Sequence, residues 1–229
     1  MNPLDIPEEL NRGTCIAQLP NGDLFCYGKD PSSGISLIID KNCKIQMLPP
    51  GTPCAFSSAV YFEKRIYCFG GLRYGPLTLA EWFDLEKQKW ISLKSIPDAD
   101  LNCHCIVYNG EILIAGSINA NILRYSINYD KYTKIHFKFE QRKRKILINL
   151  DRLYLIEFGG FVYESEIANP NKWNQIGMSR ISNNHPAQVN CSYNKGAIYI
   201  AVGLSNESYY KFDLNKKKWF NLNKEKIIL

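Results

Sequence analysis

The sequence predicts an all-β fold built from five repeated units, each made of four short antiparallel strands. Apolar runs rich in β-branched and aromatic residues end in glycine five times, and two further strand-like segments follow each run. No segment has a convincing helical periodicity. Folds in which helices connect parallel strands are therefore not expected.

The first glycine of each apolar run defines the period of the repeat. Successive glycines are 42, 46, 43 and 44 residues apart, which is a spacing typical of stacked repeats. They are Gly28, Gly70, Gly116, Gly159 and Gly203, and a second glycine follows at Gly71 and Gly160. We expect these glycines to allow a close approach of backbone where the second strand of each unit ends.

Tight turns and large aromatic residues recur in step with the glycines. The turns before the glycine runs are Asn21-Gly22, Glu63-Lys64, Asn109-Gly110, Asp151-Arg152 and Asn194-Lys195-Gly196. Such turns need positive φ angles, which asparagine and glycine tolerate best. A tryptophan opens the fourth strand in three units, at Trp90, Trp173 and Trp219. We expect these rings to pack between neighbouring units.

Four short strands cannot bury both faces of their sheet alone, so the units must stack. Radial stacking covers the faces and leaves only short edges, which is the arrangement of a β-propeller. We expect one domain over residues 1–229, with blades at about 13–53, 54–99, 100–140, 141–184 and 185–223. A closed five-bladed ring and an incompletely closed ring both remain open.

Composition suggests a cytoplasmic protein. The 229 residues have a net charge of +6, no apolar run reaches the roughly 18 residues of a membrane helix, and the first residues do not resemble a signal peptide. The eight cysteines mostly lie inside apolar runs and form no short, regular disulfide framework. We expect reduced thiols and no membrane association.

The second unit carries a family resemblance. Gly70-Gly71, then Trp82-Phe83, then Trp90 and Ser95-Ile96-Pro97, resemble the kelch motif. The likeness extends in degenerate form from about Gly13 to Leu222. It implies a kelch-type β-propeller, in the galactose-oxidase-like superfamily, whose loops on one rim bind protein partners.

Arginine and tyrosine residues on that rim are the candidate contacts. They are Arg73, Tyr74, Tyr163 and the basic run Arg142, Lys143, Arg144 and Lys145. Both residue types are common interface anchors. Lysine-rich turns are expected on the opposite rim, where their charge would attract an acidic or phosphorylated protein partner or nucleic acid, or would simply keep the surface solvated. A protein partner is expected, and nucleic acid is not.

Catalytic patterns are missing from the sequence. The histidines His104, His136 and His185 stand in no known catalytic motif, and no phosphate-binding loop is present. Cys103-His104-Cys105 is the nearest approach to a metal pattern, but it lacks a second cysteine pair, so we expect no metal or cofactor.

The expected function is a non-catalytic scaffold or substrate-recognition module. The resemblance is also compatible with a ubiquitin-ligase or cytoskeletal assembly. The alternative is a sugar-active or other small-molecule enzyme on the same fold.

Overall fold

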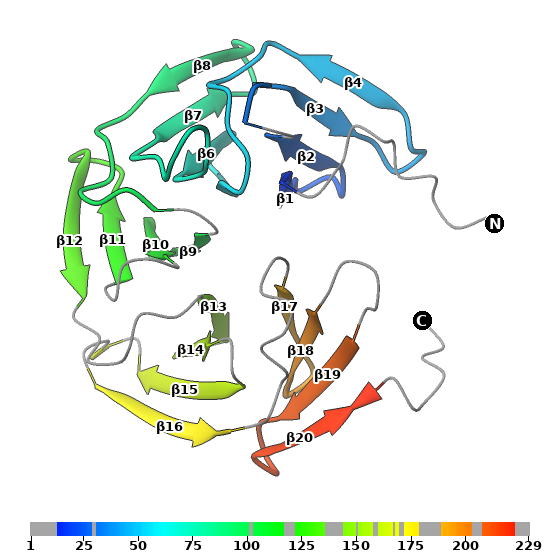
Figure 1. Ribbon diagram of the computed structural model, residues 1–229, viewed down its shortest axis with the longest axis vertical. Coiled ribbons are helices and arrows are strands. Elements are labelled where there is room, and N and C mark those ends of the chain that lie inside the picture. Colours follow the sequence, from blue (N-terminus) through cyan, green and yellow to red (C-terminus); the bar gives the residue numbers. More distant parts are fainter. Residues whose placement is uncertain are drawn as a thin grey trace. The chain divides into compact units, whose positions relative to one another are not determined.

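In the part of the chain that the computed structural model describes, twenty strands form five four-stranded antiparallel sheets (Figure 1). The structure describes residues 13–28, 31–100, 103–116, 122–135, 144–149, 151–157, 160–166, 168–169, 172–178, 189–202 and 208–222. Within these ranges there is no α-helix, and hence no helix long and apolar enough to cross a membrane. The predicted all-β fold of five four-stranded blades is confirmed.

Each sheet takes its strands in chain order. The first contains β1 (Cys15–Gln18), β2 (Leu24–Tyr27), β3 (Ser36–Ile39) and β4 (Ile45–Leu48). The second contains β5 (Ser58–Phe62), β6 (Arg65–Phe69), β7 (Ala80–Asp84) and β8 (Lys89–Ser92), and the third β9 (His104–Tyr108), β10 (Glu111–Ala115), β11 (Ile122–Ser126) and β12 (Lys131–Ile135). The fourth contains β13 (Arg144–Asn149), β14 (Arg152–Glu157), β15 (Phe161–Glu166) and β16 (Trp173–Gly177), and the fifth β17 (Val189–Asn194), β18 (Ala197–Val202), β19 (Ser208–Asp213) and β20 (Lys218–Asn221).

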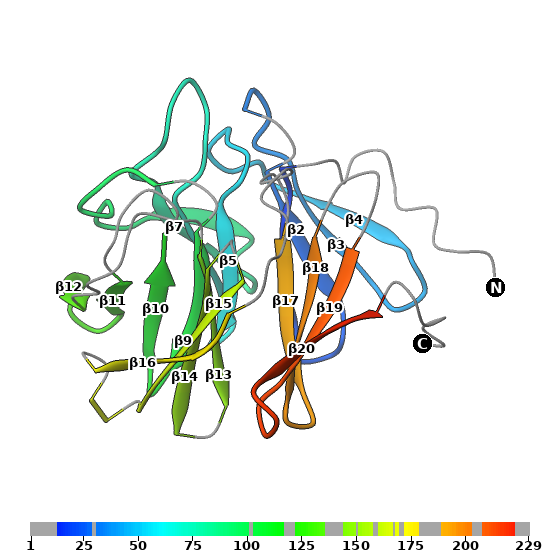
Figure 2. The same ribbon diagram turned by 60° about the horizontal axis from the view of Figure 1, so that its bottom comes forward.

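The chain divides into two compact units, residues 1–134 and 135–229. In the first unit the innermost strands β1, β5 and β9 lie side by side, and in the second unit β13 lies beside β17 (Figures 1 and 2). Neighbouring blades therefore meet through their first strands. The single-domain organisation and the closure of a ring stay predictions.

Two-residue turns join the first and second strands of several blades. Their φ angles are positive at both central residues: 47° and 63° at Glu63-Lys64, 48° and 74° at Asn109-Gly110, and 44° and 77° at Lys195-Gly196. This is the geometry of turns whose twist matches that of the flanking strands. The predicted hairpins are thus present even where glutamate and lysine replace the favoured asparagine and glycine.

Alternate residues of β6 serve two different cores. Ile66 and Cys68 pack toward the first sheet in a cluster that includes Phe25. Tyr67 and Phe69 pack toward the third sheet, where the rings of Phe69 and Tyr125 are 5.5 Å apart. Because both faces of this strand are buried, its sequence is continuously apolar rather than alternating.

A buried carboxylate joins the first sheet to the second. Glu81 of β7 is 4% exposed, and its Oε1 accepts a hydrogen bond of 2.5 Å from the Tyr27 hydroxyl of β2. The hydroxyl of Thr52, in the linker between the sheets, donates to Glu81 Oε2 at 2.9 Å. A buried charge is tolerated only when its oxygens have such partners.

In the second and third sheets an aromatic residue on the fourth strand is hydrogen-bonded to the linker that precedes the sheet. Trp90 Nε1 of β8 donates to the Pro49 carbonyl at 2.9 Å, and the Tyr132 hydroxyl of β12 donates to the Lys94 carbonyl at 2.7 Å. Pro49 follows β4 as Lys94 follows β8, so the two contacts are equivalent. Trp90 also packs against Tyr27, with ring centroids 4.7 Å apart.

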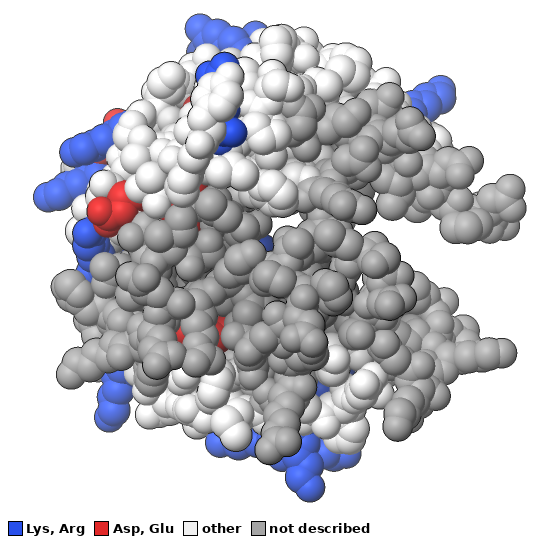
Figure 3. All heavy atoms as spheres, viewed as in Figure 1, with Lys and Arg blue, Asp and Glu red and all other residues white. Residues whose placement is uncertain are grey.

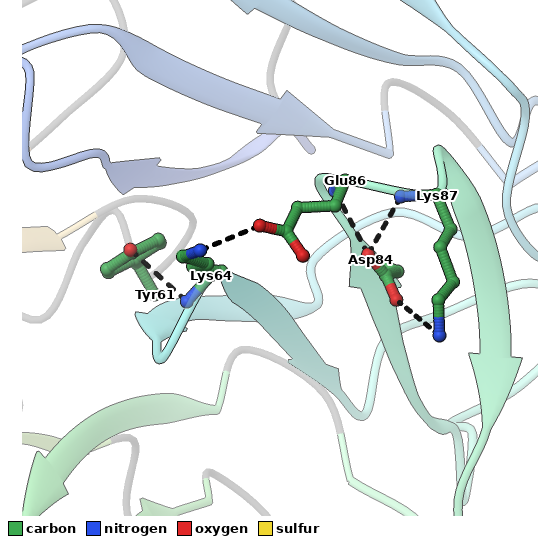
Figure 4. A network of polar contacts seen from close by, with 5 residues as sticks. All are labelled: Tyr61, Lys64, Asp84, Glu86 and Lys87. Carbon is green, nitrogen blue, oxygen red and sulfur yellow. Dashed lines mark hydrogen bonds and ion pairs between the residues drawn. The ribbon is translucent and has the colours of Figure 1, made fainter.

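Aspartates shape the turns between third and fourth strands. Asp84 Oδ1 accepts hydrogen bonds from the backbone N–H groups of Glu86 and Lys87 at 3.0 and 2.9 Å (Figure 4). Asp213 does the same with Asn215 and Lys216 at 3.1 and 2.9 Å. The N–H donors lower the pKa of both carboxyl groups, the Lys87 and Lys216 amides being the largest cause.

Gly28 and Gly70 stand where the next linker crosses the end of a second strand. Their φ angles are 70° and 65°. A Cβ would lie 2.7 Å from the Cys54 carbonyl oxygen at Gly28, and 2.7 Å from the Asp100 carbonyl oxygen at Gly70. Both positions therefore need glycine for conformation and for space.

Gly70→Ala is expected to destabilise the fold while Gly75→Ala leaves it nearly unchanged. The left-handed backbone alone costs about 1–2 kcal/mol with a side chain, and the clash with Asp100 adds to this. A Cβ at Gly75, in the same loop, meets nothing within 4 Å. Thermal melting followed by circular dichroism measures the difference. Equal melting temperatures for the two variants would contradict this account of the repeat glycine.

Asp84→Ala is expected to lower the melting temperature at neutral pH, and by less in acid. Because folding depresses the pKa of this carboxyl, its stabilisation is complete above the ordinary value of 3.8 and is lost as pH falls through the lower folded value. Melting curves of wild type and variant from pH 7 to pH 3 check this. A gap in melting temperature that stays constant over that range would count against it.

Two further variants distinguish the hydrogen bonds within the turn from the general effect of removing a negative charge. Asp84→Asn keeps an oxygen acceptor and should retain most of the stability at pH 7 without the acid dependence. Glu86→Ala removes an exposed carboxylate that pairs with the Lys64 ammonium at 2.7 Å, and should change little.

Candidate functional site

The loop between β6 and β7, residues 70–79, presents the most exposed large side chain among the described hydrophobic residues. Tyr74 at its tip is 96% exposed. The guanidinium carbon of Arg73 lies 5.3 Å from the centre of the Tyr74 ring, a cation–π arrangement. Two residues selected from the sequence as partner contacts thus stand together on one loop tip.

Backbone hydrogen bonds fix the base of this loop to the linkers on both sides. Leu72 and Ala55 exchange N–H···O bonds of 2.7 and 2.9 Å, which tie the loop to the linker before β5. Gly71 N–H donates to the Asp100 carbonyl at 2.9 Å, which ties it to the linker before β9. The tip is therefore exposed on a base held by two neighbouring segments.

The linker beside the loop contains a strained residue. Phe56 has a φ of 57°, a left-handed conformation that a bulky side chain rarely adopts. Its N–H donates to the Gly13 carbonyl at 2.7 Å. Backbone strain of this kind persists where the surrounding contacts determine the conformation, and it is concentrated at functional sites.

The structure corrects the loop position assigned to Tyr163. This residue lies inside β15, opposite Leu155 of β14, and is 3% exposed. Its hydroxyl is 3.5 Å from Glu157 Oε2, and its ring lies beside that of Phe161 at 6.4 Å. The strand simply begins earlier than the sequence suggested, so the side chain packs between sheet elements and is not available to a partner.

The basic run proposed as a second contact lies only partly in the described residues. Arg142 and Lys143 lie outside them, Arg144 is the first residue of β13, and Lys145 is the second. Lys145 is half-buried and near Cys191, whose pKa burial raises to about 12 against the opposing effect of that ammonium. Lys145 therefore belongs to the contact between β13 and β17.

The remaining repeat residues have varied surroundings. A Cβ at Gly116 would collide with the carboxylate of Asp100, and Gly71 and Gly160 have φ angles of 122° and 85°. Trp219 packs on Phe212 with ring centroids 5.0 Å apart, and Trp173 opens β16. Gly159 and Gly203 lie outside the described residues.

Three lysines of the first unit form ion pairs with carboxylates. Lys64 pairs with Glu86 at 2.7 Å, Lys134 with Asp98 at 2.9 Å, and Lys87 with Asp84 at 3.8 Å (Figure 4). In Figure 3 the blue side chains are scattered over the described part of this face and form no continuous patch. This pairing weakens the field that would attract a polyanion.

A polar cavity of about 180 Å³ lies in the fourth sheet and was not anticipated from the sequence. Its lining consists of Arg152, Glu166, Asn169, Lys172 and Asn174. The guanidinium of Arg152 lies 3.9 Å from Glu164 and 3.7 Å from Glu166, so its charge is already balanced. The lining residues come from β14, β15, β16 and the turn between β15 and β16.

The cysteine–histidine run lies at the start of β9. Cys103 and Cys105 are 2% and 5% exposed in the core between the second and third sheets, and Cys105 N–H donates to the Ser58 hydroxyl at 3.1 Å. Among the residues the structure describes, no group of three histidine, cysteine or acidic side chains could hold a metal ion.

Comparison with known proteins gives two matches. The family model described as "Kelch motif" matches residues 53–97. Spermatocyte protein spe-26 of Caenorhabditis elegans is 30% identical over 88 residues, which cover 35% of this chain and 15% of that protein. The chain thus corresponds to a small part of that relative's length. The matched motif contains the β6–β7 loop and the glycine pair before it, so the resemblance to the kelch motif predicted for the second unit is confirmed over residues 53–97.

Proposed function

We propose that the chain is a non-catalytic protein-interaction module that contacts its partner through the β6–β7 loop. The exposure of Tyr74 beside Arg73 is the observation that carries this proposal. Tyrosine and arginine dominate binding energy at interfaces because they combine a wide contact area with directed hydrogen bonds. The kelch motif supports the same general role, since it spans this loop.

The fixed base of the loop favours binding. Association costs free energy for every segment that it must order, and a loop already held at Leu72 and Gly71 by backbone hydrogen bonds avoids much of that cost. The charge at the tip is positive, because Arg73 is its only charged residue. An acidic or phosphorylated protein segment is therefore the favoured partner class.

Tyr74→Ala is expected to weaken partner binding by at least about tenfold without changing the melting temperature. The side chain touches solvent over nearly all its surface, so its removal costs the fold little. Affinity capture of the full chain from a cell extract, quantified by mass spectrometry against the variant, identifies partners that depend on Tyr74. The dissociation constant of each purified partner then gives the magnitude.

Tyr129→Ala is the matched control. Tyr129 is 81% exposed, but it lies in the turn between β11 and β12, at the opposite end of the strands from the β6–β7 loop. Partners lost equally in both variants, or in neither, would overturn the assignment of the loop. The capture is repeated at two salt concentrations. A protein-binding role would be contradicted if the captured material were mainly nucleic acid and were lost at high salt.

A further inference from the structure

Three buried thiols gather where the first sheet meets the second. Cys15 lies on β1, Cys68 on β6, and Cys54 in the linker between the sheets. Their exposures are 8%, 0% and 0%, and all three belong to one core cluster. The proposed partner contact at Tyr74 uses none of them.

Two hydrogen bonds converge on the sulfur of Cys15. The Ser57 hydroxyl lies 3.3 Å from it, and the Cys68 thiol is hydrogen-bonded to it from the neighbouring sheet. These contacts, with that of Cys68 the largest, lower the pKa of Cys15 in spite of its burial. Burial and the same contact raise the pKa of Cys68. These contacts therefore favour the thiolate form at Cys15 over that at Cys68.

Cys54 is the less suitable partner for Cys15. Its side-chain hydrogen bonds run to Tyr27 and Ser57, and burial raises the pKa of its thiol to about 11. Cys15 is also the member of the pair with surface left at solvent, whereas Cys68 has none. Cys15 is therefore the thiol of the pair that we expect to react first.

We propose that Cys15 and Cys68 are a redox-sensitive dithiol that closes to a disulfide between the first two sheets on reaction with a low-molecular-weight disulfide such as oxidised glutathione. The Cys15 thiolate attacks one sulfur of the reagent, its S–S bond breaks, and one glutathione leaves as thiolate and takes up a proton. Cys68 then loses its proton and attacks the Cys15 sulfur of the mixed disulfide, releasing the second glutathione. Two electrons and two protons pass in total to the reagent.

Closure of this bond would fix β1 against β6. Cys68 lies two residues before Gly70, where the β6–β7 loop begins, so the cross-link would stand directly under the base of that loop. The sheets must move closer together, because a disulfide is shorter than a thiol–thiol hydrogen bond. Constraint of the unfolded chain should raise the melting temperature by about 5–10 °C if the new bond is unstrained.

The test treats the folded full-length chain with oxidised glutathione at pH 7, blocks the remaining thiols and maps the products by mass spectrometry. The expected product joins the Cys15 and Cys68 peptides and is lighter by two hydrogens. Cys68→Ser should stop the reaction at a glutathione adduct on Cys15. Ser57→Ala should slow the reaction at Cys15 several-fold at neutral pH, because it removes a hydrogen bond that favours the thiolate.

Cys43→Ser is the control for general thiol reactivity, since Cys43 is exposed in the turn between β3 and β4 and lies outside the cluster. It should leave the Cys15–Cys68 product unchanged. Modification of wild type confined to Cys43, a Cys15–Cys54 bridge, or an unchanged rate in Ser57→Ala would each overturn the proposal. Mapping of the wild-type products by mass spectrometry needs no variant, so it tests the proposal even where a variant fails to fold.

Discussion

The contact between one sheet and the next is the interaction on which each unit of this protein depends. A four-stranded sheet with two apolar faces cannot be stable in water until both are covered. On β6 the side chains divide between two cores, with Cys68 turned to one and Phe69 to the other. Hydrogen bonds then fix the position of one sheet against the next. Examples are the bond from the Tyr27 hydroxyl to Glu81 and the bond from Trp90 Nε1 to the Pro49 carbonyl.

The sequence was sufficient to predict what is local and repeated. Tight turns such as Asn109-Gly110 require positive φ angles, which only a few residue types adopt easily. Such turns can therefore be recognised from the residue types in the sequence. Each apolar run that ends in glycine is weak evidence by itself, but the recurrence of five such runs every 42 to 46 residues is strong evidence for a repeat. The number of blades and their strand order followed from this pattern alone.

Contacts between distant residues were beyond sequence reasoning. Glu81 sits in an apolar strand and gives no sign that its partners are Tyr27 and Thr52, one sheet away. Tyr163 shows the opposite failure: a polar-tipped aromatic near a glycine pair resembles a loop contact, yet it pairs within β15 and is buried. Tyr74 was placed correctly because it follows the glycine pair that ends the second strand of the unit, where the repeat predicts a loop.

The contact between the first and second sheets stabilises the fold, holds the base of the exposed loop and contains the thiols. The linker of residues 49–57 supplies the Pro49 carbonyl to Trp90, the Ala55 backbone to Leu72 of the β6–β7 loop, and the Ser57 hydroxyl to Cys15. Its left-handed Phe56 is held among these contacts. A change at the thiols therefore acts on the segment that also holds the base of the loop. Because packed joints shift between discrete arrangements rather than deform smoothly, a covalent bond there has a direct physical route to the surface that carries Tyr74.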